Sequence, residues 1–121
     1  MKRIVIAFAL ISAVAVHAQD NAWMNGKWNI HTEMYGRSSD TPCVFTQRGS
    51  DLTGICESPA GSMKVAGKVD GSKVSWSHTV GYGGVQITMT TSGTLNGGKI
   101  TGKVTASAGG MDAPVTATRM N

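Results

Sequence analysis

The sequence predicts an all-β protein, an antiparallel up-and-down β-barrel of about eight strands, from three observations. Short polar turns that contain glycine separate aliphatic residues at Val69–Val74 and Leu95–Ile100, with a looser copy at Gln47–Leu52. Apolar and polar residues alternate on both sides of each turn, which is typical of β-hairpins. No helical period interrupts the hairpins, and a long meander removes its edges by closing into a barrel.

The N-terminal residues 1–18 are predicted to be a secretory signal peptide. A basic start precedes an uncharged apolar run from Ile4 to Val16, and the tripeptide ending at Ala18 resembles a signal-peptidase site. The run is too short for a membrane anchor. We therefore expect one domain over residues 19–121, located in the periplasm or outside the cell.

The charge of the mature chain indicates neither nucleic acid nor an anionic membrane as a partner. The eleven Lys and Arg residues become nine when Lys2 and Arg3 leave with the signal peptide, and seven acidic residues give a net charge of +2. The basic residues are also spread singly along the chain, so we interpret them as solubilising charge.

Eight segments carry a strand pattern, and each ends at a turn or loop signal. The first alternates from Trp28 to Met34, and the next two flank the polar turn after Gln47. Asp-Gly and Asn-Gly-Gly turns divide the fourth strand from the fifth and the sixth from the seventh, and Gly81–Gly84 is a loop. Pro114 stands near the start of the last strand, where a missing N–H is tolerated. The predicted strands are Gly26–Tyr35, Cys43–Gln47, Leu52–Glu57, Met63–Val69, Val74–Val80, Val85–Leu95, Ile100–Ala106 and Ala113–Arg119.

The two cysteines are predicted to form a disulfide across the second and third strands. If Gln47 faces Leu52 across the turn, Cys43 faces Cys56, where Cβ atoms approach closely enough for a bond. Paired cysteines are also typical of exported proteins.

The hairpin register keeps the apolar faces on one side of the sheet. Gly67 is expected near Trp76 and Val65 near His78, and a slip of one residue would expose an apolar row. Two breaks in the strand pattern also allow two alternatives, a half-open barrel of about six or seven strands and a small sandwich. The expected inward set is Trp28, Ile30, Met34, Phe45, Met63, Val65, Val69, Val74, Trp76, His78, Ile87, Met89, Leu95, Ile100, Val104 and Val115.

The mature chain resembles the calycins, the group that contains lipocalins, fatty-acid-binding proteins and avidins. Gly26-Lys27-Trp28 matches their G-x-W signature, and Arg119 matches the basic residue that packs across that Trp. Leu52-Thr53-Gly54 and Ile100-Thr101-Gly102 look like the L-T-G strands of avidin-type barrels. The resemblance implies that Trp28 closes one barrel end and that Arg119 stacks on its ring. It does not imply biotin, because the aromatic and polar pocket residues of avidins have no match.

Signatures of most catalytic and metal-binding classes are absent from the sequence. No H-E-x-x-H, G-x-S-x-G or phosphate-binding loop occurs, and the acidic residues are scattered. His31 is expected on the outer face and His78 on the inner face, so we expect neither a metal site nor a cofactor.

One end of the predicted barrel gathers the residues that indicate function. The imidazole of His78 can hydrogen-bond a ligand or act as a general acid or base, unless water or backbone simply satisfies it. Methionine thioethers suit an apolar ligand of variable shape, although they also suit core packing. Tyr35 and Tyr82, beside glycine-containing loops, add hydroxyls. The candidate ligand-binding residues are Trp76, His78, Met34, Met63, Met89, Tyr82 and Tyr35, with His78 as the catalytic candidate.

Three functions from different classes fit these features. The favoured one is an exported protein that binds a small apolar or aromatic molecule. The second is a small barrel lyase or isomerase that acts on an apolar substrate without a cofactor, with His78 as acid–base. The third is a protein-binding module that resembles periplasmic protease inhibitors, although its short N-terminal segment Gln19–Asn25 offers only Trp23 as an anchor.

Overall fold

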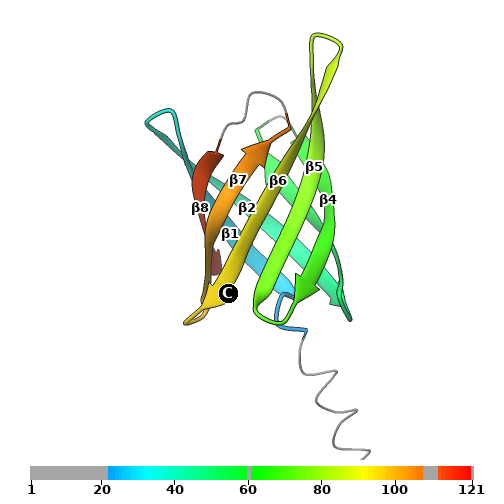
Figure 1. The fold of residues 1–121 in the computed structure, drawn as a ribbon, viewed down its shortest axis with the longest axis vertical. Coiled ribbons are helices and arrows are strands. Elements are labelled where there is room, and N and C mark those ends of the chain that lie inside the picture. Colours follow the sequence, from blue (N-terminus) through cyan, green and yellow to red (C-terminus); the bar gives the residue numbers. More distant parts are fainter. Residues whose placement is uncertain (1–21, 60, 108–111, 121) are drawn as a thin grey trace, which may run out of the picture.

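The structure, a computed structural model, describes residues 22–59, 61–107 and 112–120, and of Tyr82 only the backbone. The expected signal peptide, residues 1–18, lies outside the described residues. The described residues form a closed barrel of eight antiparallel strands, each paired with its neighbours in sequence, with β1 beside β8 (Figure 1). The strands are β1 (Gly26–Met34), β2 (Arg37–Arg48), β3 (Asp51–Ser58), β4 (Gly61–Asp70), β5 (Lys73–Tyr82), β6 (Val85–Asn96), β7 (Lys99–Ala106) and β8 (Asp112–Arg119).

This topology confirms the predicted fold class and excludes the half-open barrel and the sandwich. Closure leaves every strand with two neighbours, which removes the free sheet edges of an open meander. The architecture is also consistent with a calycin-like fold.

The hairpin of β2 and β3 has the predicted register. Gln47 pairs with Leu52 and Cys43 pairs with Cys56. The two cysteines form a disulfide with their Cα atoms 4.0 Å apart, as the sequence predicted. Such a bond is compatible with an oxidising compartment outside the cytoplasm.

Strand β2 is longer than the sequence predicted. It begins at Arg37 rather than at Cys43, and it pairs with β1 along its whole first half. The residues from Arg37 to Asp40 are exposed, so no apolar face forms there and the alternation that marks a half-buried strand is missing.

One end of the barrel is closed by the segment that precedes β1. The indole of Trp28 is buried and donates a hydrogen bond to the carbonyl of Met24, at 3.0 Å. The guanidinium carbon of Arg119 lies 4.4 Å from the centre of the Trp28 ring, which is the packing that the resemblance implied. Arg119 also donates to the carbonyls of Trp23 and Asn25. Met24, absent from the expected inward set, is fully buried here.

The middle of the barrel is filled by two aromatic rings. Phe45 and Trp76 pack with their ring centres 4.9 Å apart. The Phe45 ring covers Gly54 on β3, and Trp76 is the strand partner of Gly67 on β4. Filling the closed end and the middle leaves space only toward the opposite end, which we call the mouth.

Candidate functional site

A cavity of about 190 Å³ occupies the mouth half of the barrel. Trp76, buried beneath it, forms part of its wall, and strands β1 to β7 all contribute side chains. We call this space the mouth cavity. It is lined by Ile30, Thr32, Met34, Ser39, Thr41, Cys43, Cys56, Met63, Val65, Trp76, His78, Met89, Thr91 and Val104.

Five of the seven candidate ligand-binding residues lie together in this cavity. They are the indole of Trp76, the imidazole of His78 and the thioethers of three methionines, Met34, Met63 and Met89. The methionines are half-buried and pack against the core. The disulfide lines the same space, so the wall is unusually rich in polarisable sulfur.

Of the two candidate tyrosines, only Tyr35 has a described side chain, and it lies outside this group. Tyr35 occupies the turn between β1 and β2 with a φ of 54°, its side chain is 84% exposed, and it does not line the cavity. The turn conformation directs it outward, so the expectation that Tyr35 contacts ligand is not supported. Tyr82 belongs to β5, but its side chain lies outside the described part of the structure.

His78 is the most distinctive polar group of the cavity. It lies directly opposite Met89 in the ladder between β5 and β6. Its Nδ1 atom is buried and has no hydrogen-bond partner among the described residues. Burial lowers the pKa of this imidazole from its ordinary value, so the neutral form is favoured at neutral pH. A neutral, unpartnered ring nitrogen is suited to accept a hydrogen bond or to donate its lone pair to a metal ion.

Four hydroxyls on the cavity wall were not among the sequence candidates. Thr32 and Thr91 belong to the inward faces of predicted strands, so their position alone could have identified them. Ser39 and Thr41 lie in the first half of β2, which the sequence did not predict as a strand. These groups add weak polarity to a largely apolar wall.

An opening in the strand pairing lies beside His78. The last pair between β4 and β5 toward the mouth is Ala66 with Ser77, although both strands continue beyond it. Val65 and His78, expected near each other, both line the mouth cavity, although the ladder ends one step before them. On the outside, a groove of about 630 Å³ follows the same opening, and His78 lines it as well.

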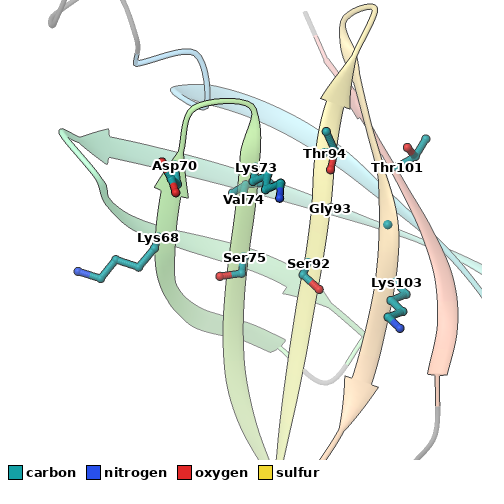
Figure 2. A pocket seen from close by; sticks show the side chains of 11 residues that line it. Lys68, Asp70, Lys73, Val74, Ser75, Ser92, Gly93, Thr94, Thr101 and Lys103 are labelled. Atoms are coloured by element: carbon teal, nitrogen blue, oxygen red, sulfur yellow. The ribbon is translucent and has the colours of Figure 1, made fainter.

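A second outer concavity, of about 490 Å³, lies over β4 to β7. Figure 2 shows Lys68 and Lys103 on opposite sides of it, with Ser75 and Ser92 between them. Both lysines already face carboxylates, since Lys68 is 2.5 Å from Asp51 and Lys103 is 3.7 Å from Asp112. Lys73 also lines the concavity, and its ladder partner Asp70 adds a carboxylate there. The mixed charges do not single out an anion site.

His31 lies on the outer face, as predicted, and forms a polar network there. Its Nδ1 is 2.8 Å from Asp40 and its Nε2 is 2.6 Å from Glu33. Hydrogen bonds to Asp40 and then Glu33 raise the pKa of His31. The pKa of Glu33 is lowered by Ser38 and then His31, and that of Asp40 by Asn29 and then His31. Both ring nitrogens are thus occupied, which indicates a structural role.

Within the described parts of the chain, no three His, Cys, Asp or Glu side chains are grouped so as to hold a metal ion. The same residues contain no helix with the length and hydropathy needed to cross a membrane. The case for a function rests on the mouth cavity itself, because the sequence matches no protein-family model and no curated protein.

Proposed function

We propose that this protein is an exported, calycin-like barrel that binds a small apolar or aromatic molecule in the mouth cavity. The observation that carries the proposal is the convergence of Trp76, His78 and three methionines on one largely apolar space. Binding sites for small molecules typically combine an apolar wall with a few polar groups that fix orientation. The signal-like N-terminus and the disulfide support export.

The size of the cavity limits the ligand. An engineered apolar cavity of roughly 150 Å³ in another protein binds benzene, so a volume of about 190 Å³ suits one aromatic ring or a short alkyl chain. The best small ligands gain about 1.5 kcal/mol per heavy atom, which limits a six-atom ring to about 9 kcal/mol. We therefore expect dissociation constants from about micromolar to millimolar.

Two properties of the wall favour an aromatic ligand. Thioether sulfur makes favourable contacts with aromatic rings, worth about 0.3–1.5 kcal/mol each. The unpartnered Nδ1 of His78 supplies one hydrogen-bonding group, which suits a ring that carries a hydroxyl or an amine. The ligand class that fits best is a single-ring phenol or aniline.

The test is a fluorescence titration of the mature, oxidised protein with single-ring aromatics up to millimolar concentration. Trp76 lines the cavity, whereas the indole of Trp23 donates to the carbonyl of Gly71 at the closed end. Saturable quenching that disappears in Trp76→Phe but persists in Trp23→Phe supports the proposal. Absence of a saturable change across the panel would overturn it.

An acid–base enzyme that uses His78 is the second candidate, favoured by the unpartnered ring nitrogen. Turnover of a bound ligand that is lost in His78→Gln, with binding retained, would select it. The protease-inhibitor alternative gains no support from Trp23, which packs edge-on against Trp28 with ring centres 6.4 Å apart.

A further inference from the structure

We propose that the mouth cavity also binds one copper(I) ion, with the thioethers of Met34, Met63 and Met89 and the imidazole of His78 as ligands. Soft thioether ligands select copper(I) among the common biological metals, and imidazole is a good ligand for copper. This inference goes beyond the binding of an organic molecule and does not depend on it. It also revises the expectation of no metal, which considered only histidine and cysteine ligands.

The strand order places three of these ligands on adjacent strands. Met63, His78 and Met89 belong to β4, β5 and β6, which are neighbours in the barrel. His78 and Met89 are direct partners in the ladder, so their side chains leave neighbouring backbones toward the same face. Met34 enters the cavity from β1 on another part of the wall. The long, flexible methionine side chains can adjust until their sulfur atoms converge on one ion.

The imidazole is prepared for coordination. Metal binding requires a neutral ring with a free nitrogen. The Nδ1 atom of His78 is buried without a hydrogen-bond partner among the described residues, so no neighbouring group competes for it. His31 provides the contrast, because both of its nitrogens are held by carboxylates.

The remaining wall chemistry selects against harder metals. Among the described residues that line the cavity, none is Asp, Glu, Lys or Arg. Calcium and magnesium require several oxygen ligands of the carboxylate or carbonyl type, and structural zinc sites use thiolate and imidazole. The two cysteines are joined in a disulfide and supply no thiolate. A monovalent ion also has a smaller desolvation cost than a divalent ion in an apolar space.

Thioethers are also the suitable soft ligands for an oxidising compartment. Cysteine thiolates tend to form disulfides there, as Cys43 and Cys56 do, whereas methionine cannot form disulfides. A soft site built from methionine and histidine therefore remains available where a cysteine site would be lost.

The experiment uses the mature, oxidised protein and two probes. Silver(I), which does not change oxidation state, is titrated by calorimetry. The affinity for copper(I) is measured anaerobically by competition with a chromophoric chelator. Zinc(II) serves as the comparison with a harder metal. The proposal predicts one silver(I) or copper(I) per chain and no zinc(II) binding at the same concentrations. Failure of both soft ions to bind, or equal affinity for zinc(II), would overturn it.

The decisive variant is the triple substitution Met34→Leu, Met63→Leu and Met89→Leu. Loss of a group that only orients a metal ligand typically costs about 10–100-fold in affinity, so loss of three ligands should weaken copper(I) binding by at least about 100-fold. His78→Gln should also weaken it. Met24→Leu, at the closed end and outside the cavity, is the matched control and should bind like the wild type. Unchanged copper(I) affinity in the triple variant would refute the assignment.

The same variant separates the two proposals made for this cavity. Leucine and methionine have similar volumes, and such exchanges are among the best tolerated in a core. The triple variant should therefore remain folded, with the same far-ultraviolet circular dichroism. Its affinity for single-ring aromatics should fall only in part, because leucine keeps the wall apolar and only the sulfur–ring contacts are lost, whereas copper(I) binding should be lost with its ligands. If the wild type binds copper(I) but none of the single-ring aromatics, only the proposed function is overturned.

Discussion

The backbone at Trp76 lies so close to Gly67, its partner on the neighbouring strand, that no side chain fits between them. A Cβ atom at Gly67 would lie 1.8 Å from the carbonyl oxygen of Ser75 and 2.6 Å from the Cα atom of Trp76. Because both obstacles are backbone atoms, the strands themselves would have to move apart. The close approach of β4 and β5 beside Trp76 therefore requires a glycine at this position.

Gly67→Ala should destabilise the protein by about 2–3 kcal/mol, the range of overpacked core substitutions. The measurement is the urea midpoint of the oxidised protein at a constant m value. Gly81→Ala is the matched control, because its Cβ would meet only a side-chain atom of Gln86 at 3.7 Å. Equal midpoints for the two variants would contradict the steric account.

Arg119→Lys should weaken the closed end despite keeping the positive charge. Lysine lacks the planar guanidinium that both stacks on Trp28 and donates to two carbonyls. The expected loss is about 1–2 kcal/mol in the free energy of unfolding. Arg48→Lys, on the exposed end of β2, should change the urea midpoint little. A similar effect of both substitutions would mean that the stacking contributes nothing.

Removing the disulfide by the double substitution Cys43→Ser and Cys56→Ser should lower stability by about 3 kcal/mol. The bond closes a segment with a sequence separation of 13, and cross-links over loops of about 15 residues stabilise by roughly this amount. The measurement is urea unfolding of the variant and of the wild type, with and without reductant. Reductant should shift the wild type to the midpoint of the variant and leave the variant unchanged.

The network of His31 should give stability a distinct pH dependence. The pKa of His31 is raised in the folded state. Its contribution to the free energy of unfolding is therefore fully present at pH values below the ordinary pKa of 6.5, and it is lost as the pH rises through the folded-state pKa. The pKa values of Glu33 and Asp40 are lowered from 4.5 and 3.8, so their contributions are present above these values and are lost at lower pH. The network should therefore stabilise most between about pH 4.5 and 6.5.

Comparing melting temperatures of His31→Asn and the wild type at pH 5.5 and 8.5 tests this window. The difference should be larger at pH 5.5 and should shrink at pH 8.5. Asp51→Asn, which removes the pair with Lys68, is the control, because the pKa of Asp51 is lowered from 3.8 and this carboxylate keeps its charge across the range tested. A difference for His31→Asn that does not change with pH would show that the network does not respond to protonation.

Much of the fold could be predicted because the hairpins carry strong local signals. The polar glycine turns set the register, and the register determined which residues face inward, including the partnership of Cys43 and Cys56. The same alternation identified Trp76, His78 and the methionines as one inward group, which is why most of the candidate site was found.

The missing parts of the site have physical reasons. The start of β2 is exposed, so its sequence does not alternate between apolar and polar residues. For this reason the sequence did not identify Ser39 and Thr41 as cavity residues. Asp40 belongs to the same segment, so the sequence did not predict its hydrogen bond with His31 either. Gln47 is polar and borders a turn, yet it is buried because its side chain accepts a hydrogen bond from the backbone of Met24.

The described chain ends meet at the closed end of the barrel. Arg119 pairs with Trp28, and the backbone N–H of Met120 donates to the carbonyl of Lys27 at 2.8 Å (Figure 1). A short linker could therefore join the two ends, and a circular permutant opened at the exposed turn around Gly49 should keep the mouth intact. For the same reason, immobilising the protein through either end on a sensor surface should leave the cavity facing solution.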